Sequence, residues 1–244
     1  ADIIVASDRV SFEARSPQRY AVPVKRPNFD NPLYKRKLHI PEGTYFAVGK
    51  SLITFGWNTD LYPKGIKDYP AFLDPALKGK IGVPRPIGSS IVDFWTYIED
   101  RYGTDFLAKL AAQKPRFYES ALSGAQAVVS GEIAANLYGQ IMIDEKGQGA
   151  PVDSAMPPRG PWGAAFFAMV LKAAPHPNAA QLLADFMVSR QGQEAVTRKQ
   201  GSVLPNVTGA ILQDEEIHST DPARITPEYV EAYQKKWNAI FSGK

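Results

Sequence analysis

Segments with the character of strands and of helices alternate along the middle of this chain, and this alternation limits the fold more than any other feature. An apolar strand is expected over Lys80–Val83, and apolar residues then recur at helical spacing over 90–113, with a break at Gly103. Further segments continue the alternation, a helix over 120–130 and strands over 132–138, 150–155 and 163–171. Such alternation is typical of α/β folds, so the sequence predicts one mixed α/β assembly.

The two ends of the chain add a strand and two helices. Ala1–Ala6 is expected to form a short buried strand, and Ser7 follows in the loop at its carboxyl end, where ligands bind in open α/β sheets. The stretch PHPNAAQLLADFMVSRQGQEAVTRKQ is expected to be one helix with an apolar face made of Ala179, Leu182, Leu183, Phe186 and Met187. A last helix has Thr226 at its N-cap and Pro227 in its first turn.

Charge and composition exclude several classes of protein. The 244 residues include 28 Lys and Arg against 25 Asp and Glu, and a net charge of +3 does not indicate a nucleic-acid-binding surface. The absence of cysteine excludes disulfides, thiolate catalysis and thiolate metal sites. No apolar run approaches the roughly 18 residues that span a bilayer, and no signal segment is recognised. A phosphate-loop-like stretch, Gly43–Ser51, has the wrong glycine spacing for a nucleotide site. The other common catalytic and cofactor-binding motifs are absent, so the sequence offers no cofactor site and no catalytic residue.

Small polar residues gather at three loops next to helix starts, namely Gly88-Ser89-Ser90, Ser120 to Gly124 and Gly160 to Gly163. N–H groups at helix N-termini bind anions, although helix capping alone would explain each serine. Arg85 and Arg159 stand close to two of these loops and pair well with carboxylate or phosphate, and two aromatic residues near expected strand ends would line a cleft. The candidate ligand-binding residues are Ser7, Arg85, Ser89, Ser90, Ser120, Ser123, Tyr138, Arg159 and Trp162.

The order of several segments resembles the family 1 extracellular solute-binding proteins of bacterial ABC importers, including their ferric-ion-binding subgroup. The segments are ADIIVASD, FGWNTDLYP, LDPALKGKIGVPRP, YGTDFLAKLAAQ, AVVSGEIAANL, APHPNAAQLLADFMVSRQGQEAV and GSVLPN. The most specific part contains Asn178, Ala179, Ala180, Phe186, Ser189, Gly192 and Gln193. The resemblance implies a type II periplasmic-binding-protein-like fold, in which two α/β lobes joined by crossing strands close over a ligand. It also implies no enzyme activity, a periplasmic or extracellular location, and delivery of the solute to a membrane permease.

The resemblance also predicts how the chain divides. Residues 1–54 and 164–210 would form lobe 1, residues 55–163 lobe 2, and residues 211–244 a helical segment packed on the lobes. Family members usually carry strand and helix units before the segment similar to ADIIVASD, so we expect a truncated lobe 1 that lacks roughly one or two βα units at its N-terminus. Such a lobe would expose a strand edge, which predicts non-native self-association with another chain.

The resemblance breaks at the metal site of the ferric-binding relatives. Those relatives place adjacent tyrosines shortly after the GEIAA segment, whereas Ile141 and Met142 stand there in this chain. Tyr138 alone would not supply the pair, and Ser7 stands about where those relatives have an acidic ligand. We therefore expect no ferric site.

A small anionic organic solute is the expected ligand. Serine hydroxyls and backbone N–H groups of the loops would donate hydrogen bonds to it, and Arg85 or Arg159 would supply the countercharge. Hinge closure is expected near the crossing segments 55–58 and 161–164. The alternative ligand is a cationic polyamine or thiamine, for which the nearest carboxylates are Asp8, Asp93 and Asp144. The alternative function is a solute-sensing domain that signals to a protein partner.

Overall fold

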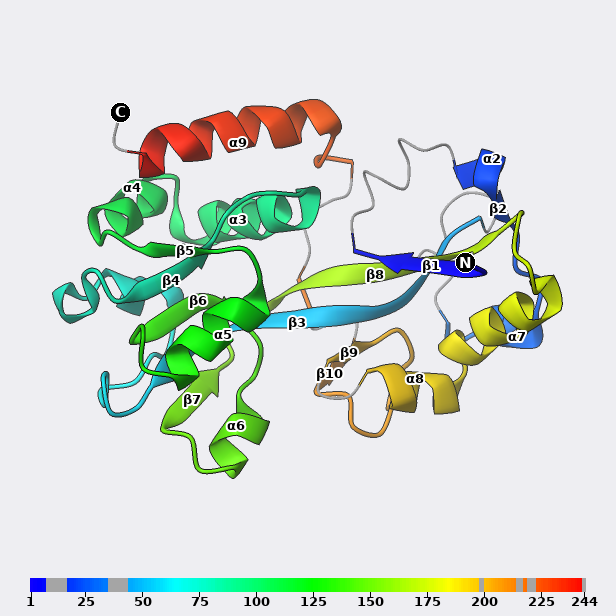
Figure 1. Ribbon diagram of the computed structural model, residues 1–244, viewed down its shortest axis with the longest axis horizontal. Helices are drawn as coiled ribbons and strands as arrows, with labels where there is room; N and C mark the ends of the chain where they lie inside the picture. Colours follow the sequence, from blue (N-terminus) through cyan, green and yellow to red (C-terminus); the bar gives the residue numbers. More distant parts are fainter. Residues whose placement is uncertain (8–16, 35–43, 198–199, 214–216, 219–222, 243–244) are drawn as a thin grey trace. The chain divides into compact units, whose positions relative to one another are not determined.

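The computed structural model describes residues 1–7, 17–34, 44–197, 200–213, 217–218 and 223–242, and its chain forms two compact units (Figure 1). Unit 1 consists of Ala1–Ser51 and Gly163–Ile217, and unit 2 of Leu52–Trp162 and His218–Lys244. Two strands carry the chain from one unit to the other, because the boundary falls inside β3 (Phe46–Asn58) and at the start of β8 (Trp162–Leu171). The segment 211–244, which was expected as one piece, is divided between the units after Ile217.

Unit 2 is built on a mixed sheet whose strands lie in the order β3, β6, β4, β5. β4 (Ile81–Pro84) lies between β6 (Ala135–Gly139) and β5 (Arg116–Tyr118) and is parallel to both. β3 pairs antiparallel with β6 and with β7 (Val152–Ala155). β4 and β6 are buried along their whole length, as is usual for parallel strands that are covered on both faces.

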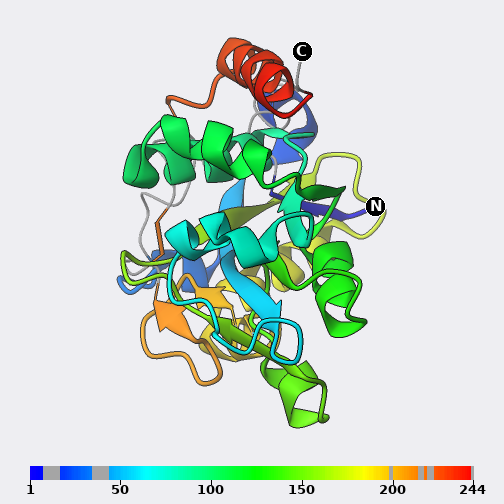
Figure 2. The same cartoon turned by 90° about the vertical axis from the view of Figure 1, so that its left-hand side faces the viewer.

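Three helices of unit 2 pack together, α3 (Ser89–Tyr102), α4 (Asp105–Ala112) and α9 (Pro227–Phe241) (Figure 2). The expected break between the first two is confirmed at Gly103, whose φ of 89° is a left-handed value that favours glycine. The described part of unit 2 also contains α5 (Ala121–Val129), the short α6 (Ile143–Gly147) and two 3-10 helices, η4 (Tyr69–Leu73) and η5 (Pro75–Leu77). In this part of the chain, no helix has the length and apolar character needed to cross a bilayer.

The last helix, α9, is fixed at its start and in its middle. Thr226 caps it as expected, because its hydroxyl accepts a hydrogen bond from the N–H of Tyr229. Tyr233 and Lys236 both donate to the carboxylate of Glu99 on α3, which is buried. These bonds join α9 to α3, so the C-terminal helix is part of unit 2.

Unit 1 places α7 (Pro177–Val188) and α8 (Arg190–Val196) beside a sheet formed around β3 and β8. β1 (Ile3–Ala6) confirms the strand expected at the N-terminus but not its burial, because Ile4 and Val5 are exposed at the edge of the sheet. β1 and β2 (Ala21–Val22) pair antiparallel with β8. β9 (Gly201–Ser202) pairs antiparallel with β3 and parallel with β10 (Leu212–Gln213). Two short helices, α2 (Pro17–Tyr20) and η1 (Pro27–Asp30), flank β2 along the chain.

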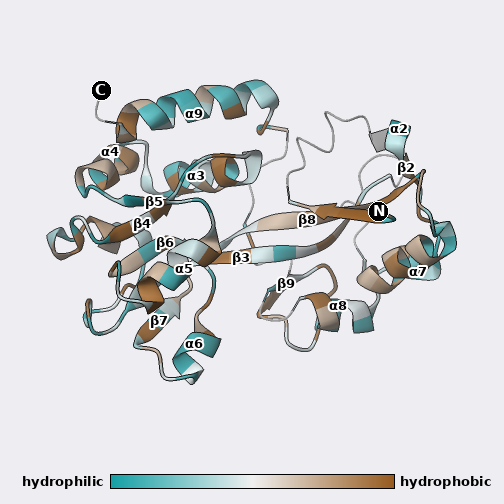
Figure 3. Cartoon of the chain, viewed as in Figure 1, coloured by the Kyte–Doolittle hydropathy of each residue, from teal (hydrophilic) through white to brown (hydrophobic). Residues whose placement is uncertain are grey.

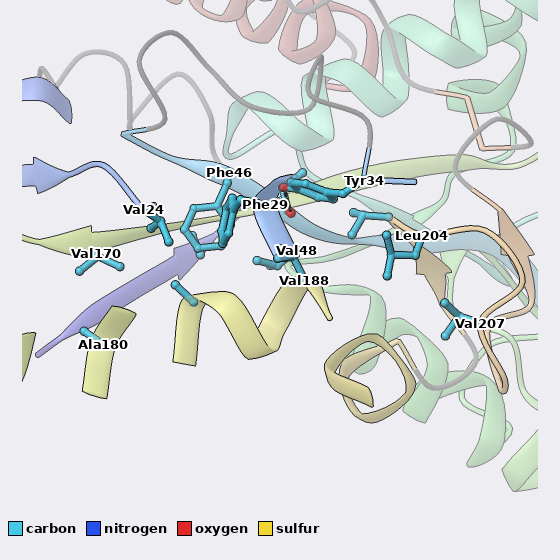
Figure 4. Close-up of a cluster of buried hydrophobic side chains, with 14 residues drawn as sticks. Val24, Phe29, Tyr34, Phe46, Val48, Val170, Ala180, Val188, Leu204 and Val207 are labelled. Atoms are coloured by element: carbon cyan, nitrogen blue, oxygen red, sulfur yellow. Dashed lines mark hydrogen bonds between the residues drawn. The ribbon is translucent and has the colours of Figure 1, made fainter. Parts of the chain in front are cut away.

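The core of unit 1 lies between this sheet and α7 (Figure 4). The ring of Phe29 packs edge-on against two others, with centroids 4.8 Å from Phe46 and 5.7 Å from Tyr34. The hydroxyl of Tyr34 donates to the carbonyl oxygen of Ala47 at 2.7 Å, so this buried polar group is satisfied. The aromatic cluster therefore attaches η1 and its following turn to β3.

The expectation of one helix after the PHPN turn is wrong, because Ser189 separates α7 from α8. Its backbone is extended (φ −73°, ψ 163°), and its hydroxyl accepts from the N–H of Gly192 and donates to the carbonyl oxygen of Phe186. The apolar face predicted for α7 is also mostly exposed, whereas a neighbouring stripe is buried, formed by Ala180, Ala184 and Val188. Small alanine side chains let the helix approach the sheet closely, which explains the choice of face.

Candidate functional site

The carboxyl ends of β4 and β5 form the edge of unit 2 at which ligands are expected to bind. The two strands are parallel neighbours, with Pro84 opposite Tyr118. From β4 the chain continues through α3 and α4 to β5, whereas from β5 it continues through α5 in the opposite direction, past β4 to β6. Right-handed crossovers in opposite directions place α3 and α5 on opposite faces of the sheet, as Figure 1 shows. The crevice where neighbouring connections diverge is the usual ligand site of open α/β sheets.

The N-terminus of α3, which follows β4 at this edge, has no side-chain cap. Its N-cap is Gly88, in an extended conformation (φ −151°, ψ 169°), and glycine has no side chain to accept a hydrogen bond from the first turn. Among the described residues, none accepts a hydrogen bond from the backbone N–H groups of Ser90 and Ile91. The side chain of Ser89 is buried and that of Ser90 is half-buried, so both expected serines lie at this helix start.

The N-terminus of α5 is arranged differently, because Ser120 and Ser123 form a capping box. The Ser120 hydroxyl oxygen accepts from the N–H of Ser123 at 3.1 Å, and the Ser123 hydroxyl donates to the carbonyl oxygen of Ser120 at 3.0 Å. These two hydroxyls satisfy each other and the first turn of the helix. The structure therefore places both predicted serines at the start of α5, after β5, but engages their side chains in the cap.

Tyr138 and Trp162 belong to an aromatic cluster that lies against α3. The ring of Phe94 on α3 is 4.8 Å from that of Tyr138 and 5.6 Å from that of Trp162, measured between centroids. Burial, and secondarily the negative charge of Asp93, raise the pKa of Tyr138, so its hydroxyl is protonated at neutral pH. Trp162 is fully buried, and its Nε1 has no hydrogen-bond partner among the described residues.

The two predicted arginines lie at opposite ends of α3. Arg85 is exposed in the loop between β4 and α3, where its backbone N–H donates to the carbonyl oxygen of Tyr118 and its guanidinium lies over the ring of Phe117, 4.7 Å from the centroid. Arg159 instead donates to the carbonyl oxygen of Arg101 at 2.7 Å, in the last turn of the helix. Because α3 has 14 residues, this contact is roughly 20 Å from the helix start. The structure thus brings Arg85, but not Arg159, to the start of α3.

The remaining predicted residues are found as follows. Ser7 is half-buried and directly follows β1 in unit 1. Of the carboxylates considered for a cationic ligand, Asp93 is half-buried in α3 and Asp144 is exposed in α6, whereas Asp8 lies outside the described residues. In the place of the tyrosine pair of ferric-binding relatives, Met142 is buried in the core and Ile141 is half-buried. No group of three or more His, Asp or Glu side chains suited to a metal ion occurs within the described part of the chain.

Sequence reasoning missed two residues that shape this edge. Gly88 was seen only as part of a serine loop, although its missing side chain is what leaves the α3 start uncapped. Asn136 on β6 is buried, and its Nδ2 donates to the carbonyl oxygen of Tyr138 at 2.6 Å. A side chain at Gly124 of α5 would collide with Asn136, so this glycine allows α5 to lie close to the strand. The run of small residues in SGAQA was the available signal for that contact.

This chain is similar to a known protein family and to one curated protein. Residues 1–226 match the profile of a family described as bacterial extracellular solute-binding protein. An uncharacterized protein of Haemophilus influenzae (strain ATCC 51907 / DSM 11121 / KW20 / Rd) is 27% identical over 190 residues, which are 73% of this chain and 54% of that protein. The chain therefore spans about half the length of this curated relative.

Two solved structures share the fold. Iron-bound HitA from Pseudomonas aeruginosa has a TM-score of 0.72 and 15% identity, and the match covers 97% of this chain and 82% of HitA. The periplasmic binding protein AfuA from Actinobacillus pleuropneumoniae, with exogenous fructose-6-phosphate bound, has a TM-score of 0.71 and 21% identity over 99% of this chain and 83% of AfuA. The expected class, a two-lobed periplasmic-binding-protein fold of mixed α/β type, is confirmed by these matches. The matched family and these structures are binding proteins, not enzymes.

Proposed function

The chain belongs to the family of bacterial extracellular solute-binding proteins, and we propose that it captures a small anionic organic solute at the carboxyl edge of β4 and β5 in unit 2. The observation that carries this proposal is the start of α3, which no side chain caps, at the carboxyl edge of β4. A helix N-terminus carries roughly half a positive elementary charge and several unpaired N–H donors, which are suited to a carboxylate or a phosphate.

Comparison with the other helices supports this choice. Side chains cap α5, α8 and α9, through Ser120, Ser189 and Thr226. Helices α4 and α7 also lack a side-chain cap, but neither of them begins at the carboxyl edge of the parallel strands. Only at α3, among the described helices of eight or more residues, do a missing cap and the diverging connections of β4 and β5 coincide.

The proposed contacts follow from the side chains at that edge. The N–H groups of Ser90 and Ile91 would donate to the anion, and Arg85 would move from the ring of Phe117 to pair with it. The protonated hydroxyl of Tyr138, which is nine-tenths buried near the end of β6, would bind a polar group on the body of the solute. An organic acid or a phosphate ester has both an anionic group for the helix start and a polar group for the Tyr138 hydroxyl.

Transport would require a second step. Hinge motion at the crossing segments 55–58 and 161–164 would enclose the solute, and a membrane permease would accept it from the closed form. The family is extracellular or periplasmic, which agrees with such a role. Small-angle scattering should show a smaller radius of gyration with a saturating anion; an unchanged radius would exclude closure.

A cationic solute is the competing proposal, and Asp93 is the observation that favours it. This half-buried carboxylate lies on α3 close enough to Tyr138 for its charge to raise the pKa of the phenol. A polyamine or thiamine would use that negative charge and would gain nothing from the N–H groups of the helix start. The two proposals therefore respond in opposite ways to a negative charge at Gly88.

Thermal unfolding with a panel of solutes tests the proposal, since a ligand that binds only the native state raises the melting temperature. The panel contains phosphate, fructose 6-phosphate, succinate, benzoate, spermidine and thiamine. The Gly88→Asp variant provides a carboxylate cap, and an added Cβ at Gly88 meets no atom within 4 Å. We expect anions to stabilise the native chain and to lose this effect in Gly88→Asp. Thr226→Asp, which places the same charge at the start of α9, should keep it. Stabilisation by the cations alone would overturn the proposal.

A further inference from the structure

The loop from Arg85 to Gly88 joins β4 to α3 and leads directly into the helix start described above. The N–H of Arg85 donates to the carbonyl oxygen of Tyr118 on β5 at 3.2 Å, which fixes the beginning of the loop. The N–H of Ile87 donates to the carbonyl oxygen of Arg85 at 2.8 Å, which closes a three-residue turn with Pro86 at its centre. The proline ring restricts φ to about −65°, close to the value that such a turn requires. The sequence of this loop thus favours one bent conformation.

A side chain of the C-terminal helix binds the middle of this loop. Nε2 of Gln234 on α9 donates to the carbonyl oxygen of Pro86 at 2.6 Å, across 148 positions of sequence. Pro86 is buried and Gln234 is half-buried, so water competes little for this bond. The carbonyl of Pro86 and the N–H of Ile87 belong to one planar peptide group. Hydrogen bonds at both ends of that group, from Gln234 and to Arg85, therefore fix the orientation of its plane.

The same face of α9 also supports the ring on which Arg85 lies. The Arg85 guanidinium lies over the ring of Phe117. Trp237 and Phe241, which follow Gln234 by three and seven positions, have ring centroids 5.4 and 6.0 Å from that ring. Figure 3 shows α9 as mainly hydrophilic, so specific contacts of this kind, rather than a broad apolar face, attach it to unit 2. One helix face thus holds both the backbone of the loop and the ring beneath its arginine.

We propose that Gln234 is a positioning residue of the solute site, an inference that rests on the function proposed above. Ile91 is buried and fixes the first turn of α3 in the core, whereas Gly88 has no side chain to restrict the chain that enters this turn. The peptide group after Pro86 therefore decides how the loop and Arg85 approach the N–H groups of the helix start. Because Gln234 holds this group before the solute arrives, less conformational entropy is lost on binding, which favours affinity.

Tyr233 offers a matched control, because it also attaches α9 to unit 2 but at a different place. Its hydroxyl donates to the carboxylate of Glu99, which follows Ser89 by ten positions and so lies about 15 Å along α3 from the helix start. Tyr233→Phe removes this bond and keeps the loop bond. Gln234→Met removes the loop bond and keeps the length and helix propensity of the side chain. A purely structural role of Gln234 in attaching α9 predicts the same behaviour for both variants.

NMR relaxation dispersion of backbone amides, in ¹⁵N-labelled samples without added solute, tests the order of the loop, since it detects exchange between conformations on the µs–ms timescale. We expect Gln234→Met to show such exchange at Ile87 and Gly88, and the native chain and Tyr233→Phe to show none there. The carbonyl ¹³C resonance of Pro86 should also shift in Gln234→Met alone, because this carbonyl loses a hydrogen-bond donor. Loop resonances that are the same in Gln234→Met and in the native chain would overturn the proposal.

Calorimetric titration with phosphate, fructose 6-phosphate and succinate tests the effect on the site. We expect Gln234→Met to weaken the binding of each anion that binds the native chain by at least about fivefold, and Tyr233→Phe to stay within about twofold. Unchanged affinity in Gln234→Met would overturn the proposal, as would equal losses in the two variants. If none of the three anions binds the native chain, the proposed function is wrong, and the loop resonances alone then decide whether Gln234 fixes the loop.

Discussion

The side-chain amide of Gln193 on α8 donates to the carbonyl oxygen of Val48 on β3 at 2.8 Å, across 145 positions of sequence. The same Nε2 also donates to the carbonyl oxygen of Met187 at the end of α7. On the other side, Oε1 accepts from the hydroxyl of Ser202 and from the N–H of Val203. Gln193 is fully buried, so one side chain joins two helices, β3 and β9 in unit 1.

Gln193→Ala is expected to lower the free energy of unfolding by about 3 kcal/mol, because it leaves several buried donors and acceptors unpaired. The neighbouring Gln191 is exposed, so Gln191→Ala should change stability by less than about 0.5 kcal/mol. Urea unfolding measures both variants. Equal effects of the two substitutions would show that the hydrogen bonds of Gln193 contribute little.

Gly192→Ala is expected to destabilise unit 1 through sterics rather than hydrogen bonding. An added Cβ would collide with the backbone carbonyl of Phe186, which the Ser189 cap holds in place. We expect a loss of about 3 kcal/mol or more, as for other cases of overpacking against fixed backbone. Gly147→Ala in α6, where a Cβ meets no atom within 4 Å, is the control and should be neutral or slightly stabilising in thermal unfolding.

Arg159→Met should leave solute affinity within about twofold, although the sequence placed this arginine in the binding site. Its guanidinium bonds the carbonyl oxygen of Arg101 at the C-terminal end of α3, where a cation stabilises the helix by up to about 1 kcal/mol. The variant should therefore melt slightly earlier and bind normally. A tenfold loss of affinity in calorimetric titration, with little change in melting temperature, would return Arg159 to the site.

The carboxyl of Asp74 in unit 2 should titrate far below an ordinary aspartate. The hydrogen bond from Lys64, followed by those from the N–H of Ala76 and the hydroxyl of Tyr62, lowers its pKa from 3.8 to about 2. Because the folded-state pKa is depressed, the stabilisation is complete above about pH 3.8 and is lost as the pH falls towards 2. Carbon-detected NMR of the side-chain carboxyl measures the midpoint. Lys64→Met should raise it towards 3.8, and an unchanged midpoint would contradict the assigned cause.

The sequence predicted the fold class and most elements, because those depend on local patterns. The Gly103 break, the Thr226 cap and the strand expected over 163–171 follow from residue types whose conformational preferences are strong. β5 and α6 were missed, since three- and five-residue elements are too short to show a period. The α7–α8 break was missed because Ser189 occupies a sequence that is otherwise helical.

The candidate site was predicted less completely, because hydrogen-bond partners depend on tertiary contacts. The sequence located Ser89, Ser90, Ser120 and Ser123 at helix starts, which the structure confirms. It could not show that Ser120 and Ser123 satisfy each other, or that Arg159 lies at the far end of α3. Whether these residues bind a solute stays a prediction.

The proposed solute site depends most on the start of α3. Backbone amide resonances of Ser90 and Ile91 in a ¹⁵N-labelled sample, followed while the best anion of the panel is added, test it most directly. We predict saturable shifts at these two amides that exceed those at Ala121 and Leu122, and their loss in Gly88→Asp. If an anion binds and stabilises the chain but leaves the amide resonances at the α3 start unchanged, the proposed solute site is wrong.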